Sequence, residues 1–296
     1  MVPDDNNKQR RNDVFHAPGS GEDDQPLPAA PPGIQTRDVM RDDFHFEVPV
    51  ETVPLPSVGL TYPVDGPLHG QETLDVRAMT AREEDILTSR ALIKKGTVMT
   101  ELIKSCLLDK TINVDEMLSG DRNALMIALR VTGYGSDYNV EIDCPSCDAR
   151  SKQSFDLGAL EIKRLSETPV ADGVNMFEYT LPVSKKNVRF KFLTGVDERE
   201  MMVVADRRKK SGIGGDSLVT SRLQQCIISI DGITDKNKIN TFIRNMPARD
   251  SLALRRFIDN SEPGIDMKSW MECPECFESS EVRLPIGASF FWPDGD

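Results

Sequence analysis

The chain has 296 residues, of which 39% are hydrophobic and 28% charged, and its formal net charge is −12. This length allows one or two domains with a sizeable core. No stretch approaches the roughly 18–20 consecutive apolar residues of a membrane helix, and no signal peptide opens the chain. The acidic balance disfavours nucleic acid as the main partner, because phosphate binding requires clustered Lys and Arg.

Residues 1–50 differ in composition from the rest of the chain. They contain seven of the 19 prolines and two of the three histidines, together with many acidic residues. The stretch APGSGEDDQPLPAAPPG at 17–33 is of low complexity and has few apolar side chains to bury. We predict a Pro- and acid-rich extended arm over 1–50, which neighbouring proteins would order.

Residues 51–136 predict an extended segment followed by a helical unit. ETLDVRAM at 72–79 alternates in part, as a strand does. In TAREEDILTSRALIKKG at 80–96, Thr80 and Glu83 match a capping box and Gly96 suits a helix end, which predicts one helix. Further helices are predicted over 97–108 and from near Asp121 to Gly133, by the spacing of their apolar residues.

Residues 137–296 predict a mixed region closed by two cysteine pairs. Alternating or β-rich runs predict strands at 138–143, 151–155, 176–181, 187–193, 268–272 and 280–286. Helical patterns occupy 197–210, 217–229, 236–245 and 248–260. The expected fold class is therefore α+β, with helical layers and short antiparallel strands.

Two short motifs of the form Cys-Pro-x-Cys carry the clearest chemical signal. They place four of the six cysteines in two pairs, and each pair has strand-like flanks: Cys144, Cys147, Cys273 and Cys276. Two such turns complete the four-sulfur shell of a structural zinc site. The 125 residues between the pairs exceed the usual ribbon spacing, but loop-closure cost grows only logarithmically. We predict a zinc-ribbon-like element of four cysteines with structural Zn²⁺, formed by two distant knuckles.

Other uses of these cysteines remain open or are disfavoured. Disulfides at the same four positions are the main alternative, because an exported particle would not keep them reduced. A thioredoxin-type redox pair belongs at the start of a helix, whereas both motifs have strand flanks. Four thiolates leave no open position for catalysis by zinc. Cys106 and Cys226 lie in apolar helical runs and are expected to be buried.

The sequence offers no catalytic constellation. Its histidines, His16, His45 and His69, all precede residue 70, and no Gly-x-Ser-x-Gly motif occurs. A Ser-His-Asp or Cys-His site would therefore need a histidine from the arm or its edge. We predict that the protein is not an enzyme and has neither catalytic nor cofactor-binding residues besides the metal ligands.

An ordered series of segments carries a resemblance to a known family. In chain order these are LPSVGLTY (55–62), VRAMTAREEDIL (76–87), LIKKGTVMTELIKSCL (92–107), MLSGDRNALMIALRVTGYGSDY (117–138) and VEIDCPSCDARSKQSFDL (140–157). Over about 55–160 the chain resembles the baseplate proteins of T-even-type bacteriophages, the hub subunits of contractile tails. The closing Cys pair fits the same general layout.

This resemblance implies a structural or assembly role in a contractile phage tail, at or near the baseplate hub. The implied partners are other baseplate and tail proteins, and the implied location is the virion after synthesis in the host cytoplasm. We expect contacts through the arm, LPSVGLTY and the terminal SFFW at 289–292. The alternatives are a zinc-ribbon nucleic-acid-binding or transcription-associated protein, and a redox enzyme acting through Cys-Pro-x-Cys.

Overall fold

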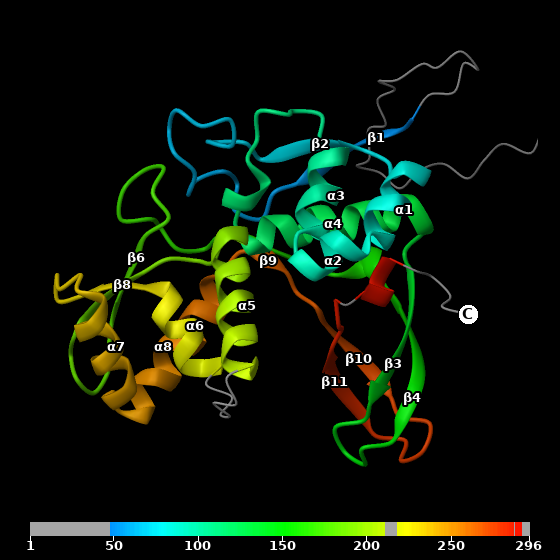
Figure 1. The fold of residues 1–296 in the computed structure, drawn as a ribbon. Helices are drawn as coiled ribbons and strands as arrows, with labels where there is room; N and C mark the ends of the chain where they lie inside the picture. Colours follow the sequence, from blue (N-terminus) through cyan, green and yellow to red (C-terminus); the bar gives the residue numbers. More distant parts are fainter. Residues whose placement is uncertain (1–47, 211–217, 287, 292–296) are drawn as a thin grey trace, which may run out of the picture. The chain divides into compact units, whose positions relative to one another are not determined.

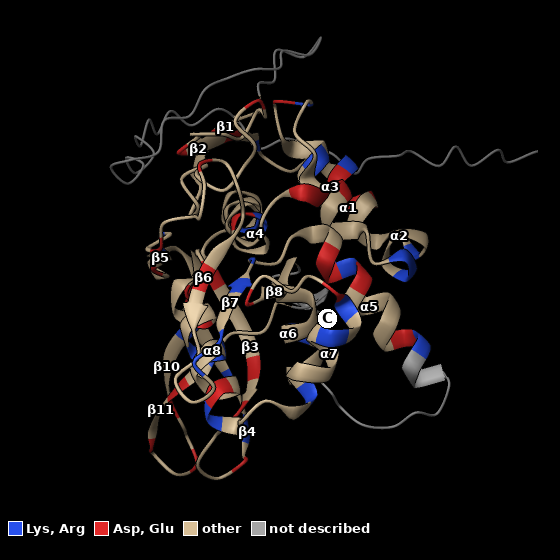
Figure 2. Ribbon diagram, turned by 90° about the vertical axis from the view of Figure 1, so that its left-hand side faces the viewer, with Lys and Arg blue, Asp and Glu red and all other residues tan. Residues whose placement is uncertain are grey.

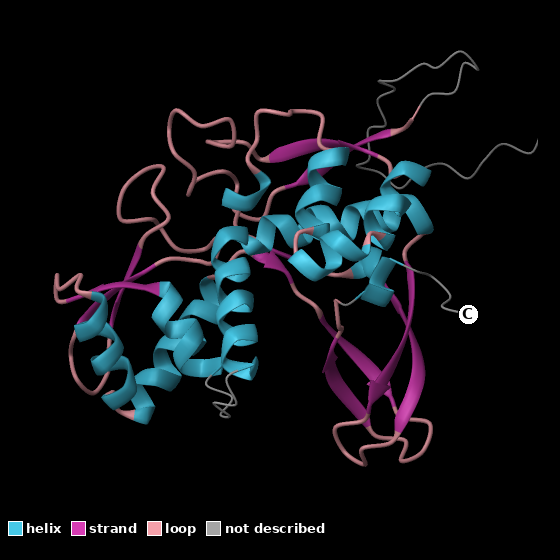
Figure 3. Cartoon of the chain, in the orientation of Figure 1, coloured by secondary structure: helices cyan, strands magenta, loops and turns pink. Residues whose placement is uncertain are grey.

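The computed structural model describes residues 48–210, 218–286 and 288–291. Within these ranges the chain forms eight α-helices and five small sheets, and every strand pair is antiparallel (Figure 1, Figure 3). This arrangement confirms the predicted α+β class. The predicted arm, apart from 48–50, lies outside the described residues.

The first described segment combines a strand pair with three helices. Strand β1 (Val50–Pro54) pairs with β2 (Thr73–Arg77), so the predicted strand at 72–79 is confirmed. The helices that follow are α1 (Ala81–Thr88), α2 (Arg90–Lys95) and α3 (Val98–Cys106). The predicted capping box is present, because the Glu83 side chain accepts a bond from the Thr80 backbone N–H at 2.9 Å.

The stretch 80–96 forms two helices instead of the single helix predicted. Ser89 has an extended backbone with ψ 104°, which separates α1 from α2. Just before it, the Thr88 hydroxyl donates to the carbonyl of Glu84 at 3.0 Å. Adjacent Thr and Ser residues offer the backbone alternative hydrogen bonds, which accounts for the break. Gly96 ends α2 in the left-handed region at φ 70°, as predicted.

Helix α4 (Ser119–Tyr134) contacts elements from several separate parts of the described chain. It packs against β1, α3, the first turns of α5 (Gly195–Lys210) and β9 (Gly264–Ile265). Gly120 allows the last of these contacts, because a Cβ there would lie 1.8 Å from the carbonyl oxygen of Pro263. The helix starts two residues before the predicted Asp121 and ends one residue after Gly133.

A three-stranded sheet and the later helices form a second group. The sheet contains β6 (Phe177–Thr180), β7 (Asn187–Phe190) and β8 (Ile227–Ile230), in that order. The remaining helices are α6 (Leu218–Cys226), α7 (Lys236–Asn245) and α8 (Ala248–Ser261). The helix predicted over 217–229 is wrong in its last residues, because 227–230 pairs with β7. The buried, β-branched Ile227 and Ile230 favour a strand there.

Two long hairpins complete the fold. Strand β3 (Asp137–Asp143) pairs with β4 (Arg150–Asp156), and β10 (Lys268–Glu272) pairs with β11 (Ser279–Arg283). A minimal pair joins β5 (Ile162–Lys163) to β9. Three short 3-10 helices are η1 (Val114–Glu116), η2 (Leu157–Ala159) and η3 (Ala288–Phe291). Figure 1 shows the hairpins next to each other, with both loops at the same end.

Buried or partly buried apolar side chains from most of these elements belong to one contiguous cluster, to which α2 and β5 contribute none. Burial of this cluster is the main favourable term in folding. Within the described ranges, none of the helices combines the length and apolar composition required to span a membrane.

Candidate metal centre

The two Cys-Pro-x-Cys motifs form the loops of the two long hairpins. Residues 144–149 join β3 to β4, and residues 273–278 join β10 to β11. In each loop the residue after the second cysteine has a left-handed backbone, with φ 57° at Asp148 and φ 58° at Phe277. The proline after the first cysteine has a fixed φ and stiffens the turn. Local sequence therefore specifies the same turn twice.

Matching backbone hydrogen bonds confirm that the two loops share one geometry. In the first loop the Cys144 N–H donates to the carbonyl of Ala149 at 2.9 Å, and the Asp148 N–H donates to the carbonyl of Cys144 at 2.9 Å. In the second loop the equivalent bonds measure 3.1 Å, from Cys273 to Glu278, and 2.9 Å, from Phe277 to Cys273. Each loop thus holds its two sulfurs on one side of a tight turn.

The four sulfur atoms of these loops meet. The Sγ atoms of Cys144 and Cys276 are 3.8 Å apart, those of Cys147 and Cys273 are 3.7 Å apart, and all four lie within 4.8 Å of one another. Sulfurs bound at about 2.3 Å to a tetrahedral zinc ion would stand about 3.8 Å apart. A disulfide would require about 2.05 Å. All four cysteines are free thiols in this arrangement.

Each loop supplies one buried and one exposed cysteine. Cys144 and Cys273 are buried, and Cys147 and Cys276 are exposed. The backbone N–H of Ser146 points at the Sγ of Cys144 at 3.4 Å. Such N–H donors stabilise the thiolate form that a metal requires.

The electrostatics of the sulfur cluster favour a bound cation. The backbone N–H groups of Cys276 and Glu275 point at the Cys273 sulfur and lower its pKa to about 7. The Ala149 backbone N–H acts in the same direction on Cys147, but the neighbouring sulfurs outweigh it and raise the pKa of Cys147 to about 12. Like charges this close disfavour a second and third ionisation. A divalent cation would remove that penalty, so the donor set fits Zn²⁺.

The prediction that the distant pairs meet is therefore confirmed. Over the described ranges, these four cysteines are the one group of His, Cys, Asp or Glu side chains placed to hold a metal ion. Four sulfurs close a tetrahedral shell and leave no position for a substrate or a reactive water. The arrangement can bind a metal ion and hold the two hairpin loops rigid. A shell of four sulfurs would offer no open position for metal catalysis.

A buried arginine ties the base of the first hairpin to the rest of the fold. Arg130 on α4 is fully buried, and its guanidinium donates to three backbone carbonyls: those of Phe290 at 2.8 Å, Gly135 at 2.5 Å and Asp137 at 2.8 Å. These bonds connect the end of α4, the start of β3 and η3. The sequence analysis missed Arg130, since an arginine in a helical pattern is normally exposed.

An aromatic contact links the same region to the second hairpin. The Tyr138 ring at the start of β3 packs edge-on against Phe290 with centroids 5.2 Å apart, and its hydroxyl donates to the carbonyl of Pro285 at 2.7 Å. Phe290 and Phe291 are fully buried. Two of the SFFW aromatics, expected as contacts with other proteins, therefore belong to the core. Trp292 lies outside the described residues.

The LPSVGLTY segment is also part of the interior. Asp121 on α4 accepts bonds from the Ser57 N–H at 2.9 Å and from the hydroxyls of Ser57 and Tyr62, both at 2.5 Å. All three residues are buried, and in this segment Leu60 alone is exposed. The expectation of a contact segment is thus corrected. The segment anchors the chain on α4, because a buried carboxylate needs several donors.

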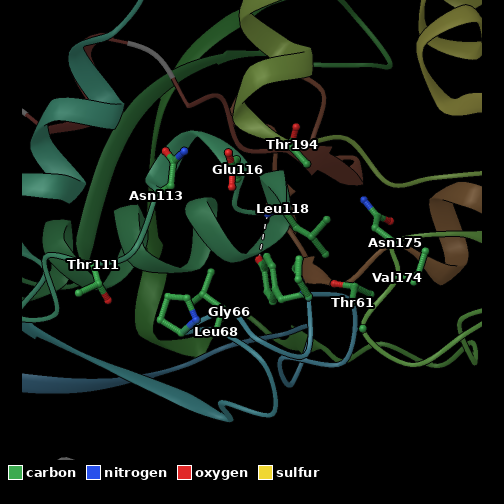
Figure 4. Close-up of a pocket in the computed structure, with 14 residues that line it drawn as sticks. Thr61, Gly66, Leu68, Thr111, Asn113, Glu116, Leu118, Val174, Asn175 and Thr194 are labelled. Carbon is green, nitrogen blue, oxygen red and sulfur yellow. Dashed lines mark hydrogen bonds between the residues drawn. The ribbon is translucent and has the colours of Figure 1, made fainter.

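A cavity of about 490 Å³ lies beside this anchor (Figure 4). Tyr62 and Leu118 line it, with the Leu118 N–H donating to the Tyr62 hydroxyl at 3.0 Å. Glu116 is the one acidic residue among the lining side chains, which also include Asn113 and Asn175. A single carboxylate among neutral groups does not make an acid–base pair.

The two remaining cysteines are buried in helices, as predicted. Cys106 ends α3 and Cys226 ends α6, and both are almost inaccessible. Burial raises the pKa of each thiol to about 12. The raised pKa disfavours the thiolate, which is the nucleophilic form, in both residues.

Comparison with known proteins identifies the family. A family model described as T4 bacteriophage base plate protein matches residues 60–292, which include all eight described helices and both Cys pairs. Comparisons with curated proteins and with solved structures found no match. The resemblance is confirmed from residue 60 onward and extends through the second Cys pair. The chain belongs to the T4 bacteriophage base plate protein family.

Proposed function

We propose that this protein acts at or next to the hub of a contractile tail baseplate, through contacts with other tail proteins and without catalysis. The family match over 60–292 supports the baseplate role, because it covers most of the chain and names a base plate protein. The position at or next to the hub is proposed from the resemblance over 55–160. Because most of LPSVGLTY and both Phe290 and Phe291 are buried, we expect these contacts on other surfaces.

We further propose that Cys144, Cys147, Cys273 and Cys276 hold one structural Zn²⁺. The two sulfur separations of 3.7 and 3.8 Å support it, since they match the edge of a zinc–sulfur tetrahedron. The bound ion would fasten two hairpins that lie far apart in the sequence. Its role would be to keep the hairpin pair rigid for contacts in an assembled particle.

Charge around the cysteines supports a protein partner over nucleic acid. Five exposed acidic residues occupy or adjoin the two loops: Asp143, which pairs with Arg150, and Asp148, Glu272, Glu275 and Glu278. Red segments mark acidic residues at the loop ends of the hairpins (Figure 2). A negative surface repels phosphates. Tight DNA binding at physiological salt would overturn this part of the proposal.

The zinc proposal is tested by elemental analysis of the purified full-length chain. We expect one zinc per chain, and we expect a chelator to remove it together with a fall in the thermal unfolding temperature. Thiol titration of the denatured, metal-stripped protein should recover all six cysteines. Native protein without metal, whose four loop cysteines are disulfide-bonded, would instead support the disulfide alternative.

The baseplate proposal is tested in the phage that encodes the chain. Deletion of the gene should abolish complete tails in electron micrographs, and complementation should restore them. Mass spectrometry of purified virions then separates a permanent component from an assembly factor, which would be needed but absent. Normal baseplates without the gene would contradict the proposal.

A further inference from the structure

The two knuckles differ at the one position where their backbone is strained. The residue after the second cysteine has φ 57° in the first loop, where it is Asp148, and φ 58° in the second, where it is Phe277. Asp, Asn and Gly adopt this left-handed conformation readily, whereas a bulky aromatic residue does so rarely. The fold therefore favours a small polar residue or Gly at this position, yet the second loop has Phe.

Burial does not account for this choice. Phe277 is 76% exposed, the largest exposure among the large hydrophobic residues of the described chain, and it belongs to neither the core nor its packed periphery. The next most exposed is Trp270, at 68%, on the outer face of the same hairpin. A strained, exposed aromatic side chain contributes little to folding. An exposed aromatic of this kind is typical of a contact with another molecule.

Three unpaired acidic residues surround Phe277 in sequence. Glu272, Glu275 and Glu278 are exposed, and none of their carboxylates forms an ion pair or side-chain hydrogen bond with a described residue. We call Phe277 and these three residues the second-knuckle tip. Its composition, one aromatic anchor with a negative rim, is complementary to an apolar pocket bordered by Lys or Arg.

We propose that the second-knuckle tip is a docking surface that inserts Phe277 into an apolar, basic-rimmed pocket of another baseplate protein. This inference rests on the proposed function of the chain. The two paired hairpins and the sulfur cluster hold the tip in place, so little conformational freedom is lost on binding. A membrane is a poor alternative occupant, because anionic lipid surfaces repel the three glutamates.

The first experiment replaces Phe277 by the photo-crosslinking residue p-benzoylphenylalanine, which keeps the phenylalanine ring and adds a benzoyl group, in phage-infected cells. Val64, 60% exposed in a loop away from both knuckles in sequence, is the matched control position. We expect an adduct from position 277 to one tail protein, with Lys or Arg flanking the crosslinked peptide. Adducts no more abundant than those from position 64 would overturn the proposal.

The second experiment measures binding to each tail and baseplate protein of the phage, purified singly. Phe277→Asn should weaken the complex with the crosslinked partner at least about tenfold, as expected for an aromatic anchor. Because Asn suits the left-handed backbone, the variant should keep its zinc and unfold at the same or a higher temperature. Asp148→Asn is the matched control in the other knuckle and should bind normally.

Charge reversal and lipid binding complete the test. Glu275→Lys with Glu278→Lys should weaken binding further at low salt, and the difference should shrink as salt rises. Binding to vesicles of phosphatidylcholine and phosphatidylglycerol that depends on Phe277 would overturn the proposal in favour of a membrane. Normal assembly of Phe277→Asn phage, in a phage that requires the gene, would sink the docking inference and leave the proposed function intact.

Discussion

The helices around α4 and the pair of long hairpins are held together by different means. Around α4, buried apolar residues surround the helix on several sides, and buried charges such as Glu83 and Asp121 have several hydrogen-bond partners. Each strand of the hairpins buries one side chain between flanking exposed ones: Tyr138, Phe155, Met271 and Val282. At the loop ends of the hairpins, the four cysteine sulfurs lie together in place of a buried apolar core.

This difference reflects how much apolar surface each region can bury. A two-stranded hairpin is marginal in water, and two hairpins with one buried residue per strand remain a thin layer. A metal ion bound by the four loop sulfurs would supply constraint where the core does not reach, as in other small elements. Four substitutions test the comparison, from the largest expected effect to the smallest.

Removal of two sulfurs should disorder the hairpins and spare the helices. For Cys273→Ser with Cys276→Ser we expect loss of metal and a fall of at least about 100-fold in hydrogen-exchange protection of β3 and β10 amides. Amides of α3 and α4 should keep their protection. Cys106→Ala is the control that removes a cysteine outside the cluster. Equal loss of protection in both regions would contradict the comparison.

Replacement of Arg130 should weaken the junction between the two regions. In Arg130→Lys the single ammonium cannot serve three carbonyls in the guanidinium's planar geometry, so buried acceptors lose their donors. We expect a loss of about 3 kcal/mol in the free energy of unfolding, measured in urea. The control Arg283→Lys, on the exposed side of β11, should change it by less than about 0.5 kcal/mol.

Loss of the Glu83 charge should destabilise the helical region in a pH-dependent way. Burial alone would raise the pKa of Glu83, but bonds from Arg77, Ser105 and Thr80 outweigh it and hold the pKa well below its ordinary value. The pKa of Glu83 is therefore lower in the folded state than in the unfolded state. The stabilisation is therefore present above the ordinary Glu value of about 4.3 and is lost as the pH falls below it.

For Glu83→Gln we accordingly expect a cost of about 2–3 kcal/mol at pH 7, because Arg77 keeps a buried charge without its partner. The difference from the unsubstituted protein should shrink as the pH is lowered towards about 3. Asp85→Asn, on the exposed side of the same helix, is the control. A cost that stays constant over this pH range would refute the role assigned to the ion pair.

The smallest effect is expected from a surface ion pair on the first hairpin. Arg150 donates to Asp143 at 2.8 Å, but both side chains are more than half exposed, so water competes for the charges. Arg150→Ala should cost almost nothing in stability, measured as the urea midpoint of unfolding, and leave the metal content unchanged. A larger cost would mean that ion pairs, and not the sulfur cluster, hold the hairpins together.

The sequence by itself determined the local turns and most elements. The capping box of Thr80 with Glu83, the end of α2 at Gly96 and the two Cys-Pro-x-Cys turns depend on a few neighbouring residues, and each appears where predicted. The strand pairs flanking both motifs were also predictable, because alternation reports a half-buried strand. The domain boundaries at 50 and 136 stay predictions.

The tertiary structure confirmed one predicted meeting of distant groups, that of the four sulfurs across a gap of 125 residues. It alone decided that Phe290 and Phe291 are buried and that LPSVGLTY turns inward onto Asp121. It also made a strand of 227–230, where helical spacing continued. These outcomes depend on competition among apolar surfaces and buried polar groups from the whole chain. For Phe277, by contrast, no contact within the described chain explains an exposed aromatic residue at this position. Its proposed partner is another protein.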